Sequence, residues 1–138
     1  MSAEENKAVG RRYFEEFHSS REYAILEEIM VSDLLEPTRQ VTHTMLTAFP
    51  DYRLTIEEQI AEEDKVATVW TGSGTHQGEW ESPAGSIAPT GREVRWLGTT
   101  TLRLSEGKIS EVLATSWDHL GILQQLGAAA VTEPRTGA

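Results

Sequence analysis

The chain has 138 residues, which is the usual size of one domain and leaves no room for a separate cofactor-binding domain. It contains no cysteine, which excludes disulfides, thiolate metal sites and cysteine nucleophiles. Its 22 acidic residues outnumber 12 scattered basic ones, and the net charge of −10 argues against a nucleic-acid partner. No apolar run is long enough for a membrane span, and the acidic Glu4 and Glu5 are unlike a signal peptide. We therefore expect a soluble cytoplasmic protein without a membrane partner.

The N-terminal third of the chain predicts three helices. Ser2 with Glu5, and Ser19 with Glu22, have the spacing of capping boxes, in which two side chains satisfy the free amides at a helix start. Apolar residues then recur at helical spacing, and we expect each set to face the core. The three sets are Val9, Tyr13 and Phe17; Leu26, Ile29 and Met30; and Val41, Met45 and Phe49.

From residue 51 the pattern changes to the alternation of apolar and polar residues that is typical of strands. Strands are predicted over residues 52–57, 65–71, 92–104 and 108–117. The Gly and Pro residues between 79 and 91 predict a loop, and the turn at Glu106 and Gly107 predicts an antiparallel hairpin. A short helix is expected from Asp118 to Leu126, stopped by Gly127.

Helices followed by successive strands predict an α+β fold, because such helices pack together on one face of an antiparallel sheet. Glycines at 72, 74 and 78 allow the sheet to curve strongly. We expect a cone-shaped half barrel whose concave face is closed by the N-terminal helices. Residues 1–130 form its single domain, and residues 131–138 form a flexible tail.

The sequence holds no recognisable metal or nucleotide motif. The four histidines lack the spacing of a ligand set, and no glycine-rich phosphate loop or nucleophile elbow is present. We therefore expect no metal and no cofactor. Any chemistry must depend on carboxylates, imidazoles and a shaped pocket.

Asp118 is the main candidate for proton transfer. It follows a strand on which Val112, Ala114 and Ser116 share its phase, and these small residues would leave space on the concave face. Burial in such a cavity would raise the pKa of Asp118 toward a value useful for a general base. The alternative is structural, because Asp is also a favoured residue at the start of a helix.

Aromatic residues are candidates for the pocket walls. Trp70 shares its strand phase with His76, and Trp96 shares its phase with Thr100, so one such face lines the interior. Core packing is the alternative for each tryptophan, and a position at a loop edge is the alternative for His76. The complete set of predicted substrate-binding residues is Tyr13, Phe17, Met45, Phe49, Trp70, Trp96, Thr100 and Ser116, and the predicted catalytic residues are Asp118 and His76.

Several short motifs in fixed order extend this interpretation. They are A-F-P-D at 48–51, G-T-H-x-G at 74–78, P-T-G at 89–91, G-K-I at 107–109 and Q-Q-L-G at 124–127. Together they resemble the SnoaL-like polyketide cyclase family of the nuclear-transport-factor-like superfamily, over about residues 5–128. The resemblance implies a cone-shaped barrel, often dimeric, with a deep apolar pocket. It also implies that the aspartate before the last helix, here Asp118, is the acid and base of an intramolecular aldol closure.

The leading hypothesis is therefore a cofactor-independent cyclase of a polyketide-like small molecule, within antibiotic or other secondary metabolism. The segment between Val31 and Glu36 is shorter than is usual in this family, which changes the cover of the pocket. Alternatives of the same fold are a cofactor-free hydroxylase, a pericyclic cyclase, or a non-catalytic protein that binds an apolar metabolite.

A homodimer is also predicted, from apolar residues on the strand faces opposite to the pocket candidates. A sheet with that face in water would carry polar residues there. The apolar residues are Val69, Leu97, Leu113 and Trp117. We expect Leu113 and Trp117 at the centre of a contact of about 800 Å² per partner, the standard size of a stable interface.

Overall fold

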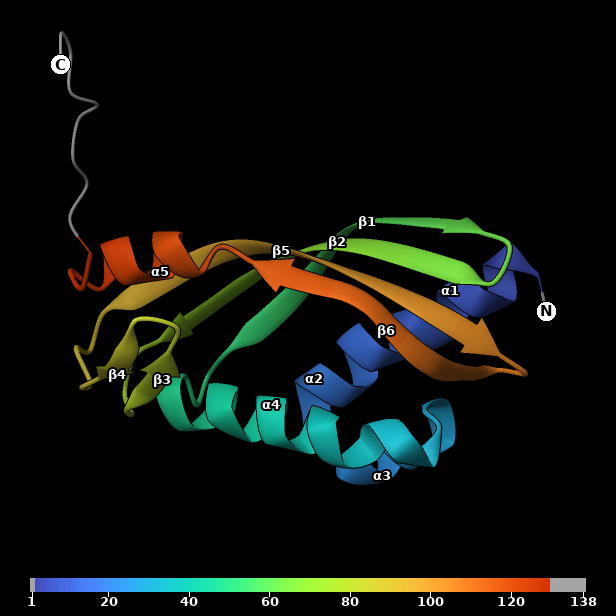
Figure 1. The fold of residues 1–138 in the computed structure, drawn as a ribbon, viewed down its shortest axis with the longest axis horizontal. Helices are drawn as coiled ribbons and strands as arrows, with labels where there is room; N and C mark the ends of the chain where they lie inside the picture. Colours follow the sequence, from blue (N-terminus) through green and yellow to red (C-terminus); the bar gives the residue numbers. More distant parts are fainter. Residues whose placement is uncertain (1, 130–138) are drawn as a thin grey trace, which may run out of the picture.

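The computed structural model describes residues 2–129, and the tail expected at 131–138 lies outside this range. Its N-terminal part is one helical run of α1 (Ala3–Arg12), a π-helical turn η1 (Tyr13–Phe17) and α2 (His18–Ser20). After it come α3 (Tyr23–Ile29), a 3₁₀ turn η2 (Ser32–Leu34) and α4 (Leu35–Ala48). These helices lie along the concave side of the sheet, as Figure 1 shows.

The two predicted capping boxes have different outcomes. The first is confirmed, because Ser2 Oγ accepts a hydrogen bond from the Glu5 amide at 3.1 Å and the Glu5 carboxylate accepts one from the Ser2 amide. The second is wrong, because α3 begins after Glu22 without a side-chain cap. Arg21 adopts a left-handed conformation, with φ of 59°, and ends the preceding helix, so Ser19 lies inside that helix.

The main sheet contains β1 (Arg53–Glu62), β2 (Lys65–Thr75), β5 (Glu93–Ser105) and β6 (Lys108–Trp117) in the antiparallel order β1-β2-β5-β6. It curves without closing, since β1 and β6 are both edge strands. The segment expected as a loop at 79–91 instead contains a small hairpin of β3 (Trp80–Ser82) and β4 (Gly85–Ile87). Each of these strands has three residues, which is too few to show an alternating pattern in the sequence beside so many Gly and Pro residues. The helix α5 (His119–Gln125) follows β6 directly.

The core is divided between the two ends of the sheet. At one end, Phe17, Leu26, Ile29 and Ile109 are fully buried between the helices and the sheet. At the other end, aromatic side chains dominate the buried cluster, together with residues of α5. Both clusters lie on the concave face, so the expected α+β half barrel with helices on that face is confirmed.

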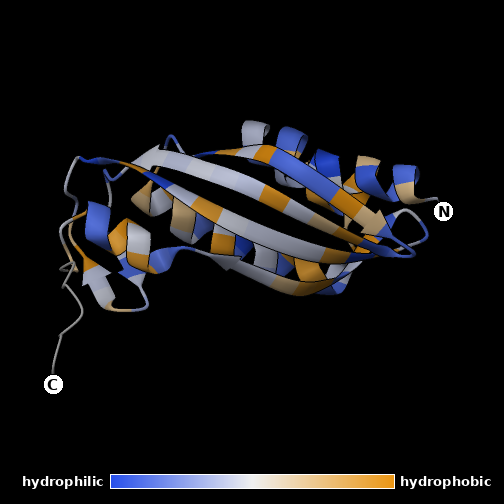
Figure 2. Cartoon of the chain, turned by 90° about the horizontal axis from the view of Figure 1, so that it is seen from above, coloured by the Kyte–Doolittle hydropathy of each residue, from blue (hydrophilic) through white to orange (hydrophobic). Residues whose placement is uncertain are grey.

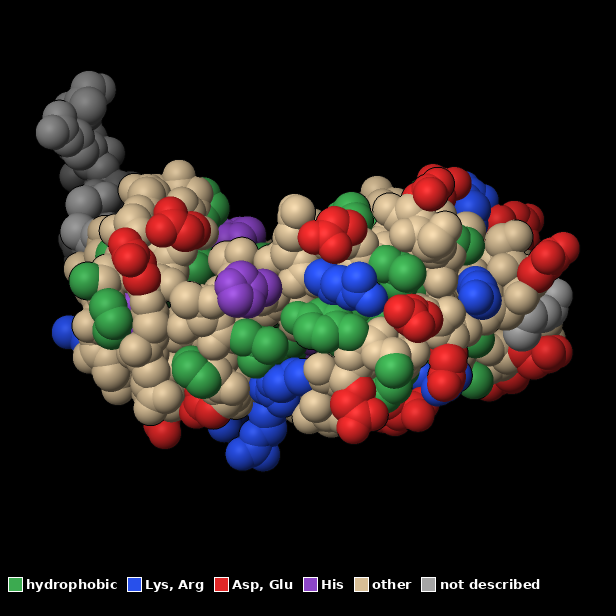
Figure 3. Space-filling model, turned by 90° about the horizontal axis from the view of Figure 1, so that it is seen from below, with side chains coloured by type: hydrophobic (Ala, Val, Ile, Leu, Met, Phe, Trp, Pro, Cys, Tyr) green, Lys and Arg blue, Asp and Glu red, His purple; other side chains and the backbone are tan. Residues whose placement is uncertain are grey.

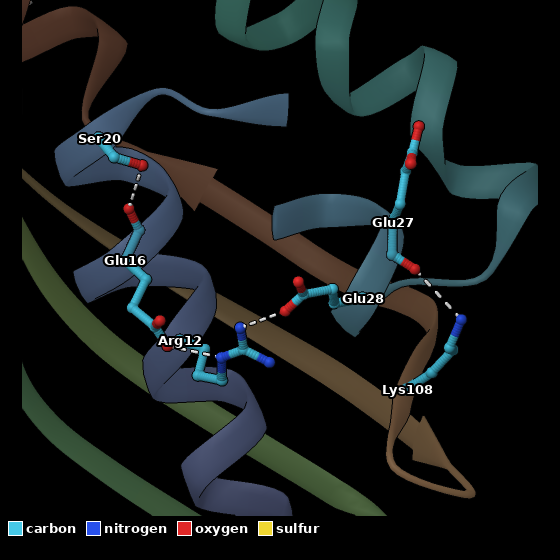
Figure 4. A network of polar contacts seen from close by, with 6 residues as sticks. All are labelled: Arg12, Glu16, Ser20, Glu27, Glu28 and Lys108. Carbon is cyan, nitrogen blue, oxygen red and sulfur yellow. Dashed lines mark hydrogen bonds and ion pairs between the residues drawn. The ribbon is translucent and has the colours of Figure 1, made fainter. Parts of the chain in front are cut away.

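Ion pairs and polar contacts join the helices to one another and to the sheet edge. Arg12 pairs with Glu16 at 2.6 Å and with Glu28 at 2.7 Å, and the Lys108 ammonium donates to the carbonyl of Glu27 at 3.2 Å (Figure 4). These contacts hold α3 between α1 and β6. The Arg12 pairs are exposed, so each contributes little to stability, and they mainly fix orientation.

A bulge in β6 changes the faces of that strand. Ala114 pairs with Thr101 and Val112 with Leu102, which leaves Leu113 as an extra residue. The bulge reverses the alternation that counting from the sequence assumes. Val112 and Trp117 consequently share the concave side, and the expectation that Trp117 lies on the outer face is wrong.

The outer face of the sheet is uncovered over most of its length in residues 2–129. Figure 2 shows the strands of the main sheet in front of the helices from this side. Leu97 is 57% exposed on that face and Leu113 is 38% exposed at the bulge. Val69 points to the same side, because its neighbour Trp70 faces the core.

Candidate active site

A cavity of about 270 Å³ lies between α4 and the concave face of the sheet. Leu34 and Val41 line it from the helical side and Val112 lines it from β6. Val41 is 53% exposed and Val112 is 41% exposed, so apolar side chains of the lining reach the surface. Figure 3, seen from the side of α4, shows hydrophobic side chains gathered near the middle of this face among acidic and basic ones. The full lining is Tyr13, Phe14, His18, Leu34, Pro37, Thr38, Val41, Thr42, Met45, Tyr52, Leu54, Trp70, Trp96, Thr100, Val112, Thr115 and Trp117.

Two tryptophans lie flat on the sheet, each above a glycine of the neighbouring strand. Trp96 pairs with Gly72 across β2 and β5, and Trp70 pairs with Gly98. A Cβ atom at Gly72 would overlap the Trp96 ring, and one at Gly98 would overlap the Trp70 ring. The glycines therefore give the aromatic rings room to form the floor of the cavity.

A short chain of hydrogen bonds fixes one part of this floor. The Trp70 indole donates to Thr100 Oγ1 at 3.0 Å, and Thr100 Oγ1 lies 3.0 Å from Thr115 Oγ1 on β6. The Trp117 ring packs against Trp70, with 6.1 Å between the ring centroids. These contacts hold the polar atoms of the floor in defined positions.

The polar pair of His18 and Tyr52 forms another part of the lining. His18 is the first residue of α2, Tyr52 immediately precedes β1, and the His18 Nδ1 and Tyr52 Oη atoms lie 2.7 Å apart. The edge of the Tyr13 ring packs on the His18 ring, with centroids 4.7 Å apart. Arg21 covers the Tyr52 ring, with its guanidinium carbon 4.6 Å from the centroid, and it also donates to the Tyr52 carbonyl.

The lining contains no Asp, Glu, Lys or Arg residue, so its titratable groups are Tyr13, His18 and Tyr52. Burial, with a smaller contribution from Arg21, lowers the pKa of His18 to about 3. Burial also raises the pKa of Tyr13 to about 12 and raises that of Tyr52 above its usual range. All three groups are therefore uncharged at neutral pH, and the cavity suits a neutral ligand with oxygen atoms that can hydrogen-bond.

The chain also matches a known protein family in sequence. A family model described as SnoaL-like polyketide cyclase matches residues 7–126, which is most of the chain. The chain belongs to the SnoaL-like polyketide cyclase family. No curated protein matches it in sequence.

Solved structures of similar proteins share the fold. AclR from Streptomyces galilaeus, for which a hydroxylase activity is proposed, has a TM-score of 0.77 and 25% identity, over 96% of this chain and 91% of AclR. IdmH from Streptomyces antibioticus, a candidate polyketide cyclase, has a TM-score of 0.73 and 23% identity, over 88% and 98%. A candidate SnoaL-like polyketide cyclase from Jannaschia sp. CCS1 has a TM-score of 0.78 and 16% identity, over 93% and 95%.

Five of the predicted substrate-binding residues line the cavity of this family member. These residues are Tyr13, Met45, Trp70, Trp96 and Thr100. Phe17 and Phe49 are fully buried in the core and do not line it. Ser116 is exposed and pairs with Thr99, on the opposite side of β6 from Thr115. The bulge at Leu113 explains the placement of Ser116.

His76 lies outside the cavity lining, in the segment after β2. Its Nδ1 accepts a hydrogen bond from the Thr90 amide at 3.2 Å, and its ring packs on Phe49. Burial lowers the pKa of His76 below its usual value. These contacts tie the two ends of the segment from 76 to 90 together, while the predicted catalytic role of His76 stays a prediction.

Asp118 is the N-cap of α5, where its Oδ1 accepts a hydrogen bond from the Gly121 amide at 2.8 Å. It is exposed and is not among the residues that line the cavity. Its catalytic role also stays a prediction. The alternative role, as a helix cap, is confirmed by this hydrogen bond.

Sequence reasoning missed the pair of His18 and Tyr52. His18 follows directly on the predicted apolar stripe of the first helix, and Tyr52 was assigned only to a strand. A histidine beside Phe17 on a helix was the available signal, but its partner is 34 residues away in the sequence. The wall residues Thr38, Thr42 and Trp117 were missed as well.

Residues 2–129 show neither a metal-binding cluster nor a membrane-spanning helix. No group of three or more His, Asp or Glu side chains gathers there in a way that could hold a metal ion. Among the helices of that range, none has both the length and the apolar character that crossing a membrane requires.

Proposed function

We propose that this protein closes a ring in a neutral polyketide-like substrate by an intramolecular aldol reaction, without a cofactor. Family membership supports a polyketide-like substrate class. The observation that carries the proposal is the cavity itself, whose lining is rich in aromatic residues, includes hydroxyl groups and contains no charged residue. A neutral poly-ketone matches that lining, because its carbonyl oxygens can accept hydrogen bonds while its carbon chain packs on the indole rings.

Shape contributes to the reaction before any proton moves. A flexible poly-ketone chain rarely brings its reacting carbons together in water, and a cavity that holds it folded removes part of that entropic barrier. Trp70 and Trp96 form a rigid floor for such a chain, since each ring is held above its glycine. Met45 on the opposite wall provides an adaptable side chain that can follow the ligand.

The resemblance assigns the proton transfer to Asp118, and one substitution tests whether this carboxylate or a group inside the cavity is the base. Because Asp118 is the N-cap of α5, its charge can be removed without loss of the helix cap. Asn is as good an N-cap as Asp, so Asp118→Asn removes the charge and retains the helix start. If Asp118 is the general base, turnover falls by about 10²–10⁴-fold in this variant while ligand binding is unchanged.

The experiment uses linear poly-β-ketone methyl esters that carry one aromatic ring. Wild-type protein is incubated with each ester, the products are separated by chromatography, and ring closure is assigned by NMR. Quenching of tryptophan fluorescence measures binding in the same samples. New carbon–carbon bonds support the proposal, whereas esters that bind tightly and are recovered unchanged would contradict it and indicate a binding protein.

Hydroxylation is the second candidate, favoured by the 25% identity to AclR. Such a reaction consumes molecular oxygen and two electrons from an added reductant, places one oxygen atom in the substrate and releases the other as water, whereas aldol closure consumes neither. The same product analysis under air and under argon separates the two. A product heavier by one oxygen atom that forms only under air would select hydroxylation.

A homodimer through the outer face of the sheet is also proposed. Leu97 and Leu113 are partly exposed there, and Val69 faces the same side. Because Trp117 belongs to the cavity, Leu97 takes its place at the centre of the proposed contact.

A further inference from the structure

We propose that His18 and Tyr52 act together as a proton relay that takes a proton from carbon at one end and delivers a proton to oxygen at the other, a step that rests on the ring closure proposed above. Both residues line the cavity, and their Nδ1 and Oη atoms lie 2.7 Å apart. This distance is that of a good hydrogen bond between a phenol and an imidazole. One proton can therefore pass between the two side chains without movement of either.

The surroundings hold this pair in place. The edge of Tyr13 packs on the His18 ring, and Arg21 covers the Tyr52 ring on another side. Tyr52 is 1% exposed and His18 is 9% exposed, so the pair is screened from bulk water. Within residues 2–129 the His18 ring makes its hydrogen bond to Tyr52, which leaves Nε2 free to meet a ligand.

The uncharged lining determines the kind of proton transfer that is feasible. An imidazolium at His18 would face Tyr13 and Tyr52 without a carboxylate, and Arg21 nearby would repel it. A tyrosinate at Tyr52 would also be costly, because burial raises the pKa of Tyr52 by more than Arg21 lowers it. A transfer in which both groups remain neutral avoids these costs, and the two nitrogen atoms of imidazole allow it by exchanging tautomers.

An aldol closure requires one proton to leave carbon and one proton to reach oxygen. His18 Nε2 takes the proton from the carbon next to one substrate carbonyl, and the electron pair of that C–H bond forms the new C–C bond to a second carbonyl carbon. The proton on His18 Nδ1 passes to Tyr52 Oη, and the proton of Tyr52 Oη passes to the oxygen of the second carbonyl. The product is a neutral hydroxyketone, and the His18 ring has changed tautomer.

The relay predicts a simpler reaction that needs no ring closure. If Tyr52 Oη delivers its proton to the oxygen of the same carbonyl, the same three transfers convert a bound ketone into its enol, so the carbon-bound proton exchanges with solvent. The probe is 2-tetralone, a neutral bicyclic ketone, in heavy water, with deuterium uptake followed by NMR. We expect wild-type protein to accelerate exchange, and both His18→Gln and Tyr52→Phe to lower the accelerated rate by about 10²-fold or more, the usual size of general base catalysis.

His43→Gln is the matched control, because His43 is exposed on α4 and does not line the cavity. Quenching of tryptophan fluorescence by 2-tetralone checks that each variant still binds the probe. Exchange that continues at the wild-type rate in His18→Gln or Tyr52→Phe with binding intact would overturn the relay. The same conclusion follows if wild-type protein binds 2-tetralone without accelerating exchange.

A second measurement needs no substitution. The exchange rate of saturating 2-tetralone should stay flat between pH 5 and pH 8, and nitrogen-15 NMR should show a neutral His18 ring at pH 5. An imidazolium at pH 5 would overturn the relay. Failure of the relay can be told apart from failure of the proposed function. Exchange of 2-tetralone without ring closure of any ester rejects the proposed function alone. Ring closure that survives both substitutions rejects the relay alone.

Discussion

At the scale of single residues, the cavity depends on groups whose properties are set by their surroundings. His18 is neutral because burial lowers its pKa, and Trp70 and Trp96 form a floor because glycines lie beneath them. Neither property belongs to the residue type alone.

His18 makes the stability of the fold depend on pH. Its pKa is about 3 in the folded chain and about 6.5 in an unfolded one, so below pH 6.5 only the unfolded chain gains a proton. The stability that neutral His18 provides is complete above pH 6.5 and is lost as pH falls toward 3, by about 2 kcal/mol at pH 5. Urea unfolding at pH 7 and pH 5 measures this loss.

His18→Gln should remove that part of the pH dependence, and His43→Gln should keep it. His76, whose pKa is also lowered by burial, adds a loss of the same sign. An unfolding free energy of wild-type protein that rises from pH 7 to pH 5 would contradict the prediction.

The position of the Trp96 ring depends on the glycine beneath it. Gly72→Ala places a methyl group where the Trp96 ring lies, so the ring must shift into the cavity. We expect a loss of about 1–3 kcal/mol in unfolding free energy, typical of overpacking, together with weaker binding of 2-tetralone. Ser73→Ala, on the opposite face of β2, should change neither quantity. Unchanged stability and binding in Gly72→Ala would show that the ring position is not tightly held.

At the scale of elements, the bulge in β6 and the cap of α5 decide which side chains reach the cavity. The extra residue Leu113 turns Thr115 and Trp117 inward. Asp118 comes directly after β6 and is the N-cap of α5. The helix is held against β5 by Gln125, whose side chain donates to the Arg95 carbonyl. The end of β6 and the start of α5 therefore form one structural unit.

Substitutions of Asp118 separate its charge from its capping role. Asp118→Ala removes the acceptor of the Gly121 amide and should cost about 1 kcal/mol, whereas Asp118→Asn should cost nearly nothing. Thermal unfolding of both variants checks this. Equal stability of the Ala variant and the wild type would mean that the 2.8 Å contact contributes nothing in solution.

At the scale of the whole molecule, one face of the sheet is covered by helices and the other is not. The proposed dimer would bury Val69, Leu97 and Leu113 against the same face of a second copy. Leu97→Glu places a buried charge at the centre of that contact, which is strongly unfavourable without a partner. Sedimentation should show a dimer for wild-type protein and a monomer for this variant, with 2-tetralone binding unchanged.

A wild-type monomer at micromolar concentration would contradict the proposed dimer. A Gln40→Glu variant is a control for added charge, since Gln40 is exposed on α4, on the helical side of the sheet. It should leave the dimer intact.

The sequence by itself determined the α+β class, most helix and strand positions and five of the cavity walls, because these depend on local periodicity. Alternation along β2 and β5 correctly placed Trp70 and Trp96 on the buried face. Tertiary structure decided the rest. The bulge at Leu113 is set by pairing with β5, and the contact of His18 with Tyr52 joins residues 34 positions apart. Local pattern carries no signal for either, because a shift in strand register and a meeting of distant side chains are fixed only when the sheet and helices pack.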